Sequence, residues 1–322
     1  MHLSPPIEPM LARPVTALPA PGARPALFEQ KADGFRALVF SGPQPFVQSR
    51  RGADLGPAFP ELLAAAAAVG VEAVFDAELV VWGAGGLDFP ALQQRARRRG
   101  AAARQAALEQ PAHLIVFDVL ELSGAVLLDE PLRRRRAALE DLFAGRRLTA
   151  PWALCPQTSD REVAVGWLDP VWGAAGIEGL VIKDPASRYR PGERGWLKLR
   201  TRITVEGIIG AVTGAVTAPR SLLLGRRDAA GRLRLVARST PLTRKAAAEL
   251  GAVLRPAGEE HPWWGRTFSA GWGTKEPLVF RPVVPDLVAE VEADTARDLG
   301  RHRHPVRYLR LRDDMSPGDV RA

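Results

Sequence analysis

The sequence predicts an α+β protein with two domains, over residues 1–201 and 202–322. Its 322 residues and 46% hydrophobic content are enough for one large domain or two ordinary ones. Strand-like and helix-like segments are mixed as far as residue 201. Beyond it, short strand-like segments surround one helix candidate at 243–254, which is the profile of a small β-barrel such as the OB-fold.

The elements of the first domain follow from local patterns. Residues 1–25 are rich in Pro and Ala, so we expect extended chain there. Runs of apolar and β-branched residues predict strands, and the run at 72–82 fits either a strand pair or one long buried strand. One of the helices is expected to begin after Asp88, as its N-cap, and to end at Gly100. The predicted strands are 35–40, 45–49, 72–82, 113–122, 177–183 and 195–200, and the predicted helices are 58–70, 88–100 and 131–145.

The second domain is predicted from the change in pattern after Arg200. Short strands are expected in the segments 204–216, 220–239, 285–293 and 306–312. The arginine runs at 97–99 and 133–136 belong to the first domain, and we expect them to be solvated helix faces or, at most, phosphate contacts.

The net charge of +8 and the pI near 10.4 favour a polyanionic partner, most often nucleic acid. The alternative is that arginine enrichment reflects a GC-rich genome, since Ala, Gly and Pro are also abundant. The single cysteine, Cys155, excludes a disulfide framework and a four-cysteine zinc site, and fits a reducing cytoplasm. His302 and His304 are expected to belong to a basic surface rather than to a metal site.

The localisation expected from the sequence is cytoplasmic and nucleoid-associated, and we expect a monomer. The N-terminal residues lack a basic segment followed by an apolar core, so no signal peptide is predicted. The most apolar stretch is interrupted by Glu72 and bounded by Glu61 and Asp76, so no membrane span is predicted.

Lysine is scarce in this chain, with only five among 44 basic residues. Lysine can lose its proton and act as a nucleophile, whereas arginine, with a pKa above about 12, cannot. A few lysines could simply survive an arginine-rich codon bias. Three of the five, however, lie in three short segments of similar design: "KADGFR" (31–36), "EGLVIK" (178–183) and "WLKLR" (196–200).

Around these lysines the sequence predicts a set of groups suited to attack on a nucleoside triphosphate. Lys31 is expected on a tight turn between two strands. Glu78 and Glu178 are carboxylates on strands, and Phe117 is an aromatic residue near a strand end. A nucleophile, acidic metal ligands, a base-stacking ring and cations for the phosphates are the groups that this reaction needs.

Strand alternation predicts which side chains of two segments share a face. It places Glu178, Leu180 and Ile182 on one face of their strand. It places Trp196, Lys198 and Arg200 on one face of theirs.

These segments resemble, in order and spacing, six motifs of the covalent nucleotidyltransferases, specifically the ATP-dependent DNA ligases. "KADGFR" is similar to that family's KxDGxR motif, and "SRRG" (49–52) to its Ser-Arg motif. "DAELV" resembles the acidic DGE-type motif with Ala for Gly, and "VFDVL" the adenine-stacking segment. "EGLVIK" and "WLKLR" resemble the last two motifs of the catalytic domain. The length and C-terminal tail look most like the small stand-alone bacterial ligase C type.

The resemblance implies an adenylation (nucleotidyltransferase) domain over 1–201, with antiparallel sheets and flanking helices, and an OB-fold DNA-binding domain over 202–322. By the same resemblance, Lys31 forms a lysyl–AMP bond. Arg36 and Glu78 hold the ribose, Phe117 stacks on the adenine, and Glu29 contacts the adenine amino group.

The resemblance also implies groups for the metal, the phosphates and the DNA. Glu178, with Glu78, binds a catalytic Mg²⁺ or Mn²⁺. Arg50 holds a DNA 5′-phosphate, with Arg51 as the alternative. The cations expected on the nucleotide phosphates are Lys183, Lys198 and Arg200.

The function implied is ATP-dependent sealing of nicked double-stranded DNA in repair, with a repair polymerase or end-binding proteins as possible partners. The alternatives are an RNA ligase, a GTP-using capping enzyme, or a degenerate nucleic-acid-binding scaffold. The scaffold is motivated by one departure: the C-terminal Arg-x-Asp-Lys motif keeps Arg312 and Asp314 but has Met315 in place of the cation. Either self-adenylylation is then slow, or another cation, such as Lys275 or Arg310, substitutes.

Overall fold

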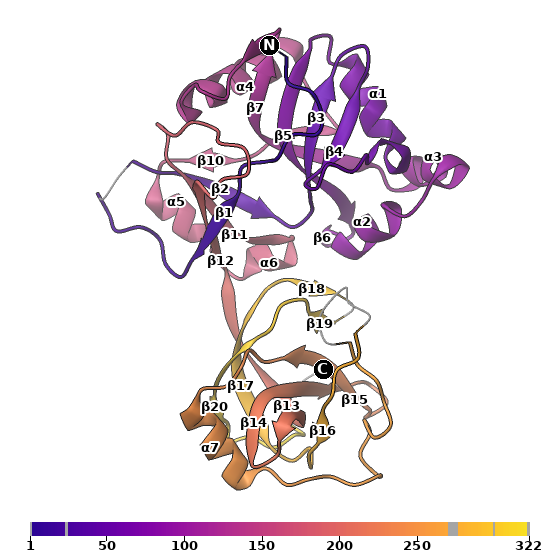
Figure 1. Ribbon diagram of the computed structural model, residues 1–322, viewed down its shortest axis with the longest axis vertical. Helices are drawn as coiled ribbons and strands as arrows, with labels where there is room; N and C mark the ends of the chain where they lie inside the picture. The colour runs from indigo at the N-terminus through magenta and orange to yellow at the C-terminus, as the bar shows by residue number, and fades with distance from the viewer. Residues whose placement is uncertain (1, 23–24, 270–275, 299, 321–322) are drawn as a thin grey trace. The chain divides into compact units, whose positions relative to one another are not determined.

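The structure is a computed structural model that describes residues 2–22, 25–269, 276–298 and 300–320 (Figure 1). The chain divides into two compact units, Met1–Thr201 and Arg202–Ala322. No helix in the described part of the chain is long and apolar enough to cross a membrane.

The first unit contains a seven-stranded sheet in which the central strands are long and buried. Its main path runs β4-β3-β5-β7-β8, with β6 paired to β5 and β9 paired to β7. All of these pairs are antiparallel except that between β7 and β9. The segment 72–82 is therefore one long strand. The strands are β3 (Phe35–Ser41), β4 (Phe46–Ser49), β5 (Ala73–Gly83), β6 (Gly86–Leu87), β7 (Ala112–Leu122), β8 (Ala125–Val126) and β9 (Trp152–Leu154).

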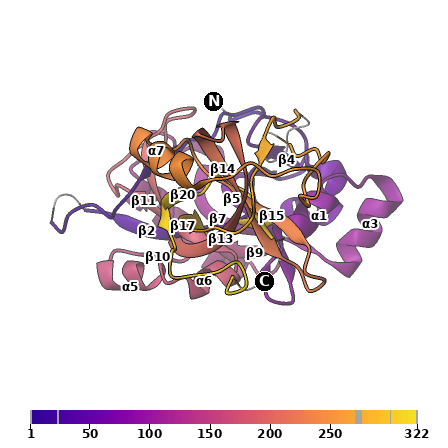
Figure 2. The same ribbon diagram turned by 90° about the horizontal axis from the view of Figure 1, so that it is seen from below.

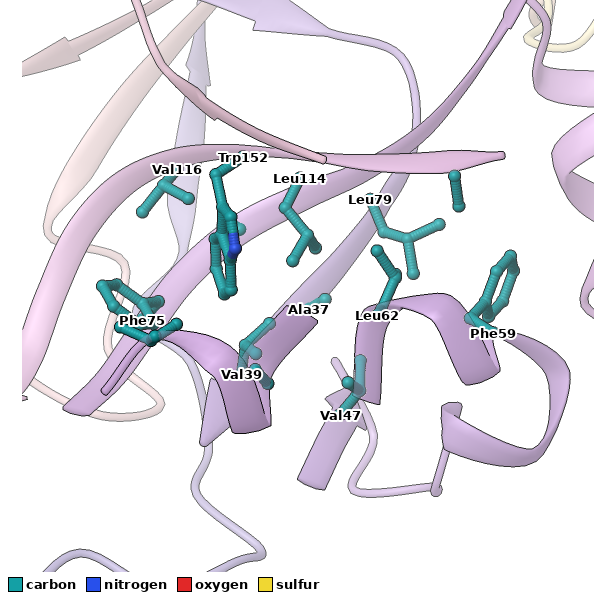
Figure 3. Packing of buried hydrophobic residues seen from close by; sticks show 14 of the residues in the cluster. Ala37, Val39, Val47, Phe59, Leu62, Phe75, Leu79, Leu114, Val116 and Trp152 are labelled. Atoms are coloured by element: carbon teal, nitrogen blue, oxygen red, sulfur yellow. The ribbon is translucent and has the colours of Figure 1, made fainter. Parts of the chain in front are cut away.

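One face of this sheet packs into the main hydrophobic core. Phe75 and Leu79 of β5 point into it, and Trp152 lies against Phe75 with ring centroids 5.1 Å apart (Figure 3). By alternation, Asp76 and Glu78 lie on the opposite face of β5. That opposite face carries the site described below. Beside the sheet lie the short 3₁₀ turn η1 (Gly56–Ala58) and the helices α1 (Pro60–Ala68), α2 (Phe89–Arg95), α3 (Gly100–Glu109) and α4 (Leu132–Arg146).

A second sheet of five strands, in the order β1-β12-β11-β2-β10, completes the first unit. β1 pairs in parallel with β12, so the N-terminal segment lies beside the strand that ends this unit. Its buried apolar side chains, such as Phe28 and Leu180, pack with α5 (Arg161–Gly166). The short helix α6 (Val171–Ala174) follows. The strands are β1 (Ala12–Val15), β2 (Leu27–Ala32), β10 (Gln157–Thr158), β11 (Ile177–Lys183) and β12 (Trp196–Arg200).

Two predictions about helices in the first unit were wrong in part. Asp88 caps α2 as expected, accepting from the Ala91 N–H at 2.8 Å, but the helix ends at Arg95. The run 97–99 is therefore not a helix face but connects α2 to α3, a helix the sequence pattern did not reveal.

The arginine run 133–136 is not a uniformly solvated face. Arg135 is fully buried and forms a two-point ion pair with the buried Asp118, at 2.8 Å for each contact. Arg136 is buried as well, and its Nη2 donates to the Cys155 carbonyl. Both guanidinium groups tolerate burial because they are paired.

The second unit is built on a strongly curved antiparallel sheet with the path β15-β14-β13-β17-β20 and β16 paired to β13 (Figure 2). A bridge between Ser239, just after β15, and Val306, just before β20, links the two ends of this path. One apolar cluster includes Leu250 of α7 (Arg244–Val253), and another surrounds Trp263. The strands are β13 (Arg202–Ala215), β14 (Ala218–Arg227), β15 (Leu233–Arg238), β16 (Arg281–Pro282), β17 (Val288–Asp294), β18 (Arg297–Asp298), β19 (Arg301–His302) and β20 (Arg307–Leu311).

Candidate active site

Lys31 lies inside β2, one residue before its end, rather than on the turn that the sequence predicted. The strands on either side of the turn do not form a hairpin, because β2 belongs to the five-stranded sheet and β3 to the seven-stranded sheet. Gly34 connects them where a Cβ atom would overlap the carbonyl oxygen of Leu79. The glycine of "KADGFR" is thus required by the close approach of this connection to β5, and Lys31, three residues earlier, lies close enough to Glu78 of β5 to interact electrostatically.

Glu178 is the direct partner of Lys31, whose Nζ donates to its Oε2. Simple alternation predicted that Glu178 shares a face with Leu180 and Ile182, and this was wrong. The register between β11 and β2 shifts at this point, and Gly179 has a φ of +136°. The bulge turns Glu178 to the opposite face from Leu180 and Ile182, which pack in the apolar cluster beside α5.

Cations gather around Lys31 and Glu178. The Arg200 Nε lies 4.0 Å from Glu178 Oε2. Burial lowers the pKa of Lys198, and the positive charges of Arg200, Lys31, Arg50 and Arg194 lower it further. Trp196, Lys198 and Arg200 share the face of β12 predicted from alternation, because the intervening Leu197 and Leu199 pack on the other side. A site with this density of positive charge is suited to a polyphosphate.

Glu78 lies on β5 opposite Arg36 of β3. Burial raises its pKa to about 7; Lys31 and Arg36 oppose the shift, whereas Asp33 and Glu178 add to it. Glu78 and Glu178 are therefore close enough to interact electrostatically. In the described part of the chain, no three His, Cys, Asp or Glu side chains form a complete metal site.

Arg36 is held by Asp76, a residue that the sequence reasoning passed over. Its Nε and Nη2 both donate to the fully buried Asp76 carboxylate, the latter at 2.5 Å. The guanidinium carbon also lies 4.7 Å from the ring centre of Phe117 and 5.2 Å from that of Trp196. Alternation provided a signal for Asp76, because it stands two residues before Glu78 on the same face of β5.

Lys183 does not lie with the phosphate-site cations in this structure. It is 1% exposed, and its Nζ lies 2.6 Å from Oε2 of the buried Glu29 and 4.6 Å from the ring centre of Phe117. Gln157 donates to the other oxygen of Glu29 at 2.7 Å. The ammonium group of Lys183 thus pairs with Glu29 and packs against the aromatic rings, and its contact with the nucleotide phosphates stays a prediction.

Arg50 and Arg51 follow β4, and both are exposed. The positive charge of Arg50 contributes to the lowered pKa of Lys198. Arg50 therefore lies near the cationic end of the site, and the assignment of the DNA phosphate to Arg50 or Arg51 stays a prediction.

The C-terminal motif lies in the second unit. Arg312 pairs with Asp314 at 2.8 Å and with Glu206 at 3.1 Å. Met315 packs, partly buried, against the apolar cluster around Trp263. Of the two cations considered as substitutes, Arg310 pairs with Glu290 and Lys275 lies outside the described residues.

The adenylation domain, the OB-fold and the lysine at the junction of two sheets define a nucleotidyltransferase of the ligase type. A family model described as "ATP dependent DNA ligase domain" matches residues 9–200, and one described as "ATP dependent DNA ligase C terminal region" matches residues 217–315. The chain belongs to the ATP-dependent DNA ligases.

Among its relatives, the chain is 32% identical to DNA ligase C of Mycobacterium tuberculosis, over 98% of this chain and 93% of that protein. It is 34% identical to DNA ligase C1 of Mycolicibacterium smegmatis, with the same coverage. Among solved structures, it is similar to the ligase domain of M. tuberculosis LigD, with 28% identity, a TM-score of 0.52 and 98% of both chains covered. A structure of mycobacterial DNA ligase D complexed with ATP and MES is equally similar, with 97% of that chain covered.

Proposed function

We propose that this enzyme seals nicks in double-stranded DNA in bacterial repair, using ATP, a divalent cation and a covalent AMP on Lys31. The proposal includes action as a monomer on nucleoid DNA. The observation that carries it is that Lys31 pairs with Glu178 and lies, with Arg200 and Arg50, close enough to Lys198 for their charges to lower its pKa. An amine at this point can meet a phosphorus atom whose oxygens are neutralised by the neighbouring cations.

The proposed reaction has three balanced transfers. Lys31 Nζ attacks the α-phosphorus of ATP, an N–P bond forms, pyrophosphate leaves, and the amine loses a proton to solvent. An oxygen of the DNA 5′-phosphate then takes the AMP group, and Lys31 is released and regains its proton. Finally the 3′-hydroxyl attacks the activated 5′-phosphate, a phosphodiester bond forms, and AMP leaves with the hydroxyl proton passing to solvent.

The residues present fit a magnesium ion with a partial protein shell. Mg²⁺ is typically held by one or two carboxylates together with substrate phosphates and water, and Glu178 and Glu78 are two carboxylates in the same electrostatic neighbourhood. When bound, the ion would neutralise charge on the phosphates. Mn²⁺ takes the same oxygen ligands.

The buried pair of Glu29 and Lys183 suits adenine better than guanine. Adenine offers a donor at N6 beside an acceptor at N1, which complement a carboxylate beside an ammonium group. Guanine presents an acceptor at O6 and a donor at N1, the reverse order. This arrangement supports ATP rather than GTP and argues against the capping-type alternative.

The test of the proposed function is intact-mass measurement of the protein with Mg²⁺ and either ATP or GTP. We expect a retained AMP with ATP, its removal by pyrophosphate, and its transfer to a nicked duplex with sealing. An adduct formed equally well from GTP would contradict the adenine assignment. A protein that binds nicked DNA but never retains AMP would support the scaffold alternative raised by Met315.

Arg50→Ala is expected to leave lysyl–AMP formation close to wild type and to slow AMP transfer to DNA by about tenfold or more, the scale of a lost charge-assisted hydrogen bond. The reason is that Arg50 lies at the cationic end of the site, after β4 and outside the nucleotide motifs. Single-turnover transfer from pre-adenylylated enzyme measures the effect.

Arg51→Ala is the matched control, because it removes the same charge from the next residue. A larger transfer defect in Arg51→Ala would reassign the phosphate contact to that residue. Loss of self-adenylylation in Arg50→Ala would place Arg50 on the nucleotide instead.

DNA binding is expected to weaken steeply with salt. Binding of a protein with net charge +8 to a phosphate backbone releases counterions, so the logarithm of affinity falls linearly with the logarithm of salt concentration. Titration of a labelled nicked duplex at several salt concentrations measures the slope. A flat dependence up to physiological ionic strength would contradict electrostatic binding.

A further inference from the structure

Tyr189 is a buried polar residue that none of the proposed reaction steps uses. It lies in the connection between β11 and β12 and is fully buried. It is one of only two tyrosines in the chain; the other is Tyr308. A buried hydroxyl costs free energy unless it is hydrogen-bonded, so its contacts indicate what it stabilises.

The Tyr189 hydroxyl closes a ring of hydrogen bonds around Arg36. It donates to Asp76 Oδ2 at 2.6 Å and accepts from the Met10 N–H at 2.9 Å. Arg36 Nη2 donates to the same Asp76 oxygen at 2.5 Å and to the Met10 carbonyl at 3.1 Å. Three segments far apart in the sequence thus fix one guanidinium group.

This ring determines the orientation of Arg36. The Asp76 carboxylate receives both Nε and Nη2, so its own orientation sets the plane of the guanidinium group. Tyr189 donates to Oδ2, the same carboxylate oxygen that accepts from Arg36 Nη2. These contacts use Nε and Nη2, and Nη1 lies outside the ring.

We propose that Tyr189 is a positioning residue for nucleotide recognition: its hydroxyl orients Asp76, and Asp76 orients Arg36 toward the ribose of ATP. The inference rests on the proposed role of Arg36 at the ribose. Burial raises the pKa of the Tyr189 hydroxyl well above its ordinary value, and Asp76 raises it further. The hydroxyl therefore stays protonated and donates at neutral pH.

The variant Tyr189→Phe tests the role of the hydroxyl separately from the packing of the ring. The ring stacks edge-to-face on Trp196, with centroids 5.8 Å apart, and lies 5.7 Å below the Arg135 guanidinium carbon. Phenylalanine keeps both contacts and removes only the hydroxyl. Tyr308→Phe is the matched control, because it makes the same chemical change in the second unit, on β20.

The experiment compares ATP with 2′,3′-dideoxy-ATP as the source of AMP for Lys31, in wild type and both variants. Wild type and Tyr308→Phe are expected to prefer ATP in kcat/KM by about ten- to a hundredfold, the scale of a hydrogen bond to a charged group. In Tyr189→Phe this preference is expected to fall by about threefold or more, through a loss on ATP alone, and the part that remains is the contribution of Glu78 at the ribose. Because both nucleotides are measured on one preparation, the ratio does not depend on the fraction of folded enzyme.

The outcomes separate the inference from the proposed function. If Tyr189→Phe keeps the wild-type preference, Tyr189 does not position Arg36 and the inference is overturned. If wild type itself shows no preference, Arg36 does not hold the ribose, and both that assignment and the inference fail. A preference reduced in Tyr189→Phe and kept in Tyr308→Phe supports it.

Discussion

Lys31→Arg is expected to fold, to bind nicked DNA and to form no AMP adduct, which is a loss of at least a thousandfold in sealing from ATP, on the scale of removing a catalytic nucleophile. Arginine keeps the charge and can still pair with Glu178. It stays protonated with its charge delocalised, so it cannot attack phosphorus. Intact mass after incubation with ATP and Mg²⁺ measures the adduct.

The control for Lys31→Arg is a nick that already carries AMP on its 5′-phosphate. The last transfer needs the 3′-hydroxyl and the phosphate site rather than the amine, so the variant should still seal this substrate. If Lys31 were only a phosphate-binding cation, arginine would serve as well or better, because its fork binds phosphate at two points. An adduct at the wild-type level in Lys31→Arg would therefore assign the nucleophile to another residue.

Glu178→Gln is expected to impair both adduct formation and the sealing of a pre-adenylylated nick, each by about a hundredfold or more, the range seen when a group that stabilises transition-state charge is removed. Glutamine has nearly the same shape, but it is a poor ligand for a hard divalent cation and does not neutralise Lys31. Glu178 is 4% exposed and touches Lys31, so the change acts at the site itself. Single-turnover rates with each substrate over a range of Mg²⁺ concentrations measure it.

Glu193→Gln is a suitable control for Glu178→Gln, because it makes the same substitution at an exposed glutamate in the connection between β11 and β12. It should retain both activities. The comparison with Lys31→Arg is the informative result. Lys31→Arg should lose adduct formation but still seal a pre-adenylylated nick, whereas Glu178→Gln should be impaired in both. A Glu178→Gln enzyme that seals pre-adenylylated nicks at the wild-type rate would exclude Glu178 from the metal site.

Much of the fold could be predicted from the sequence because its signals are local. Apolar runs predicted β5, β7, β11 and β12, and Asp88 predicted the start of α2. α3 was missed because its apolar content is mostly alanine, which gives little periodic contrast. The burial of Arg135 was missed because it depends on Asp118, a partner 17 positions away that no local pattern connects to it.

The candidate site could likewise be predicted only where its signals are local. Residue types and motif spacing identified Lys31, Glu78, Glu178, Phe117 and Lys198 as a set. Strand alternation placed Glu178 on the wrong face, because it assumes a regular strand and the bulge at Gly179 breaks the period. The pairing of Lys183 with Glu29 was not predicted, because a motif shows that a lysine is present but not how deeply it is buried.

By itself, the sequence determined the chemistry that this protein can perform: one scarce lysine in a motif, carboxylates and cations in order, and a family that these motifs share. Such information is carried by residue type and spacing along the chain. Only the tertiary structure decided which groups meet. The pairing of Lys31 with Glu178, the burial of Lys183 against Glu29, and the ring formed by Met10, Arg36, Asp76 and Tyr189 each join segments from different strands or connections. Contacts of this kind depend on sheet register and burial, which arise when distant segments pack together and are not encoded in any one of them.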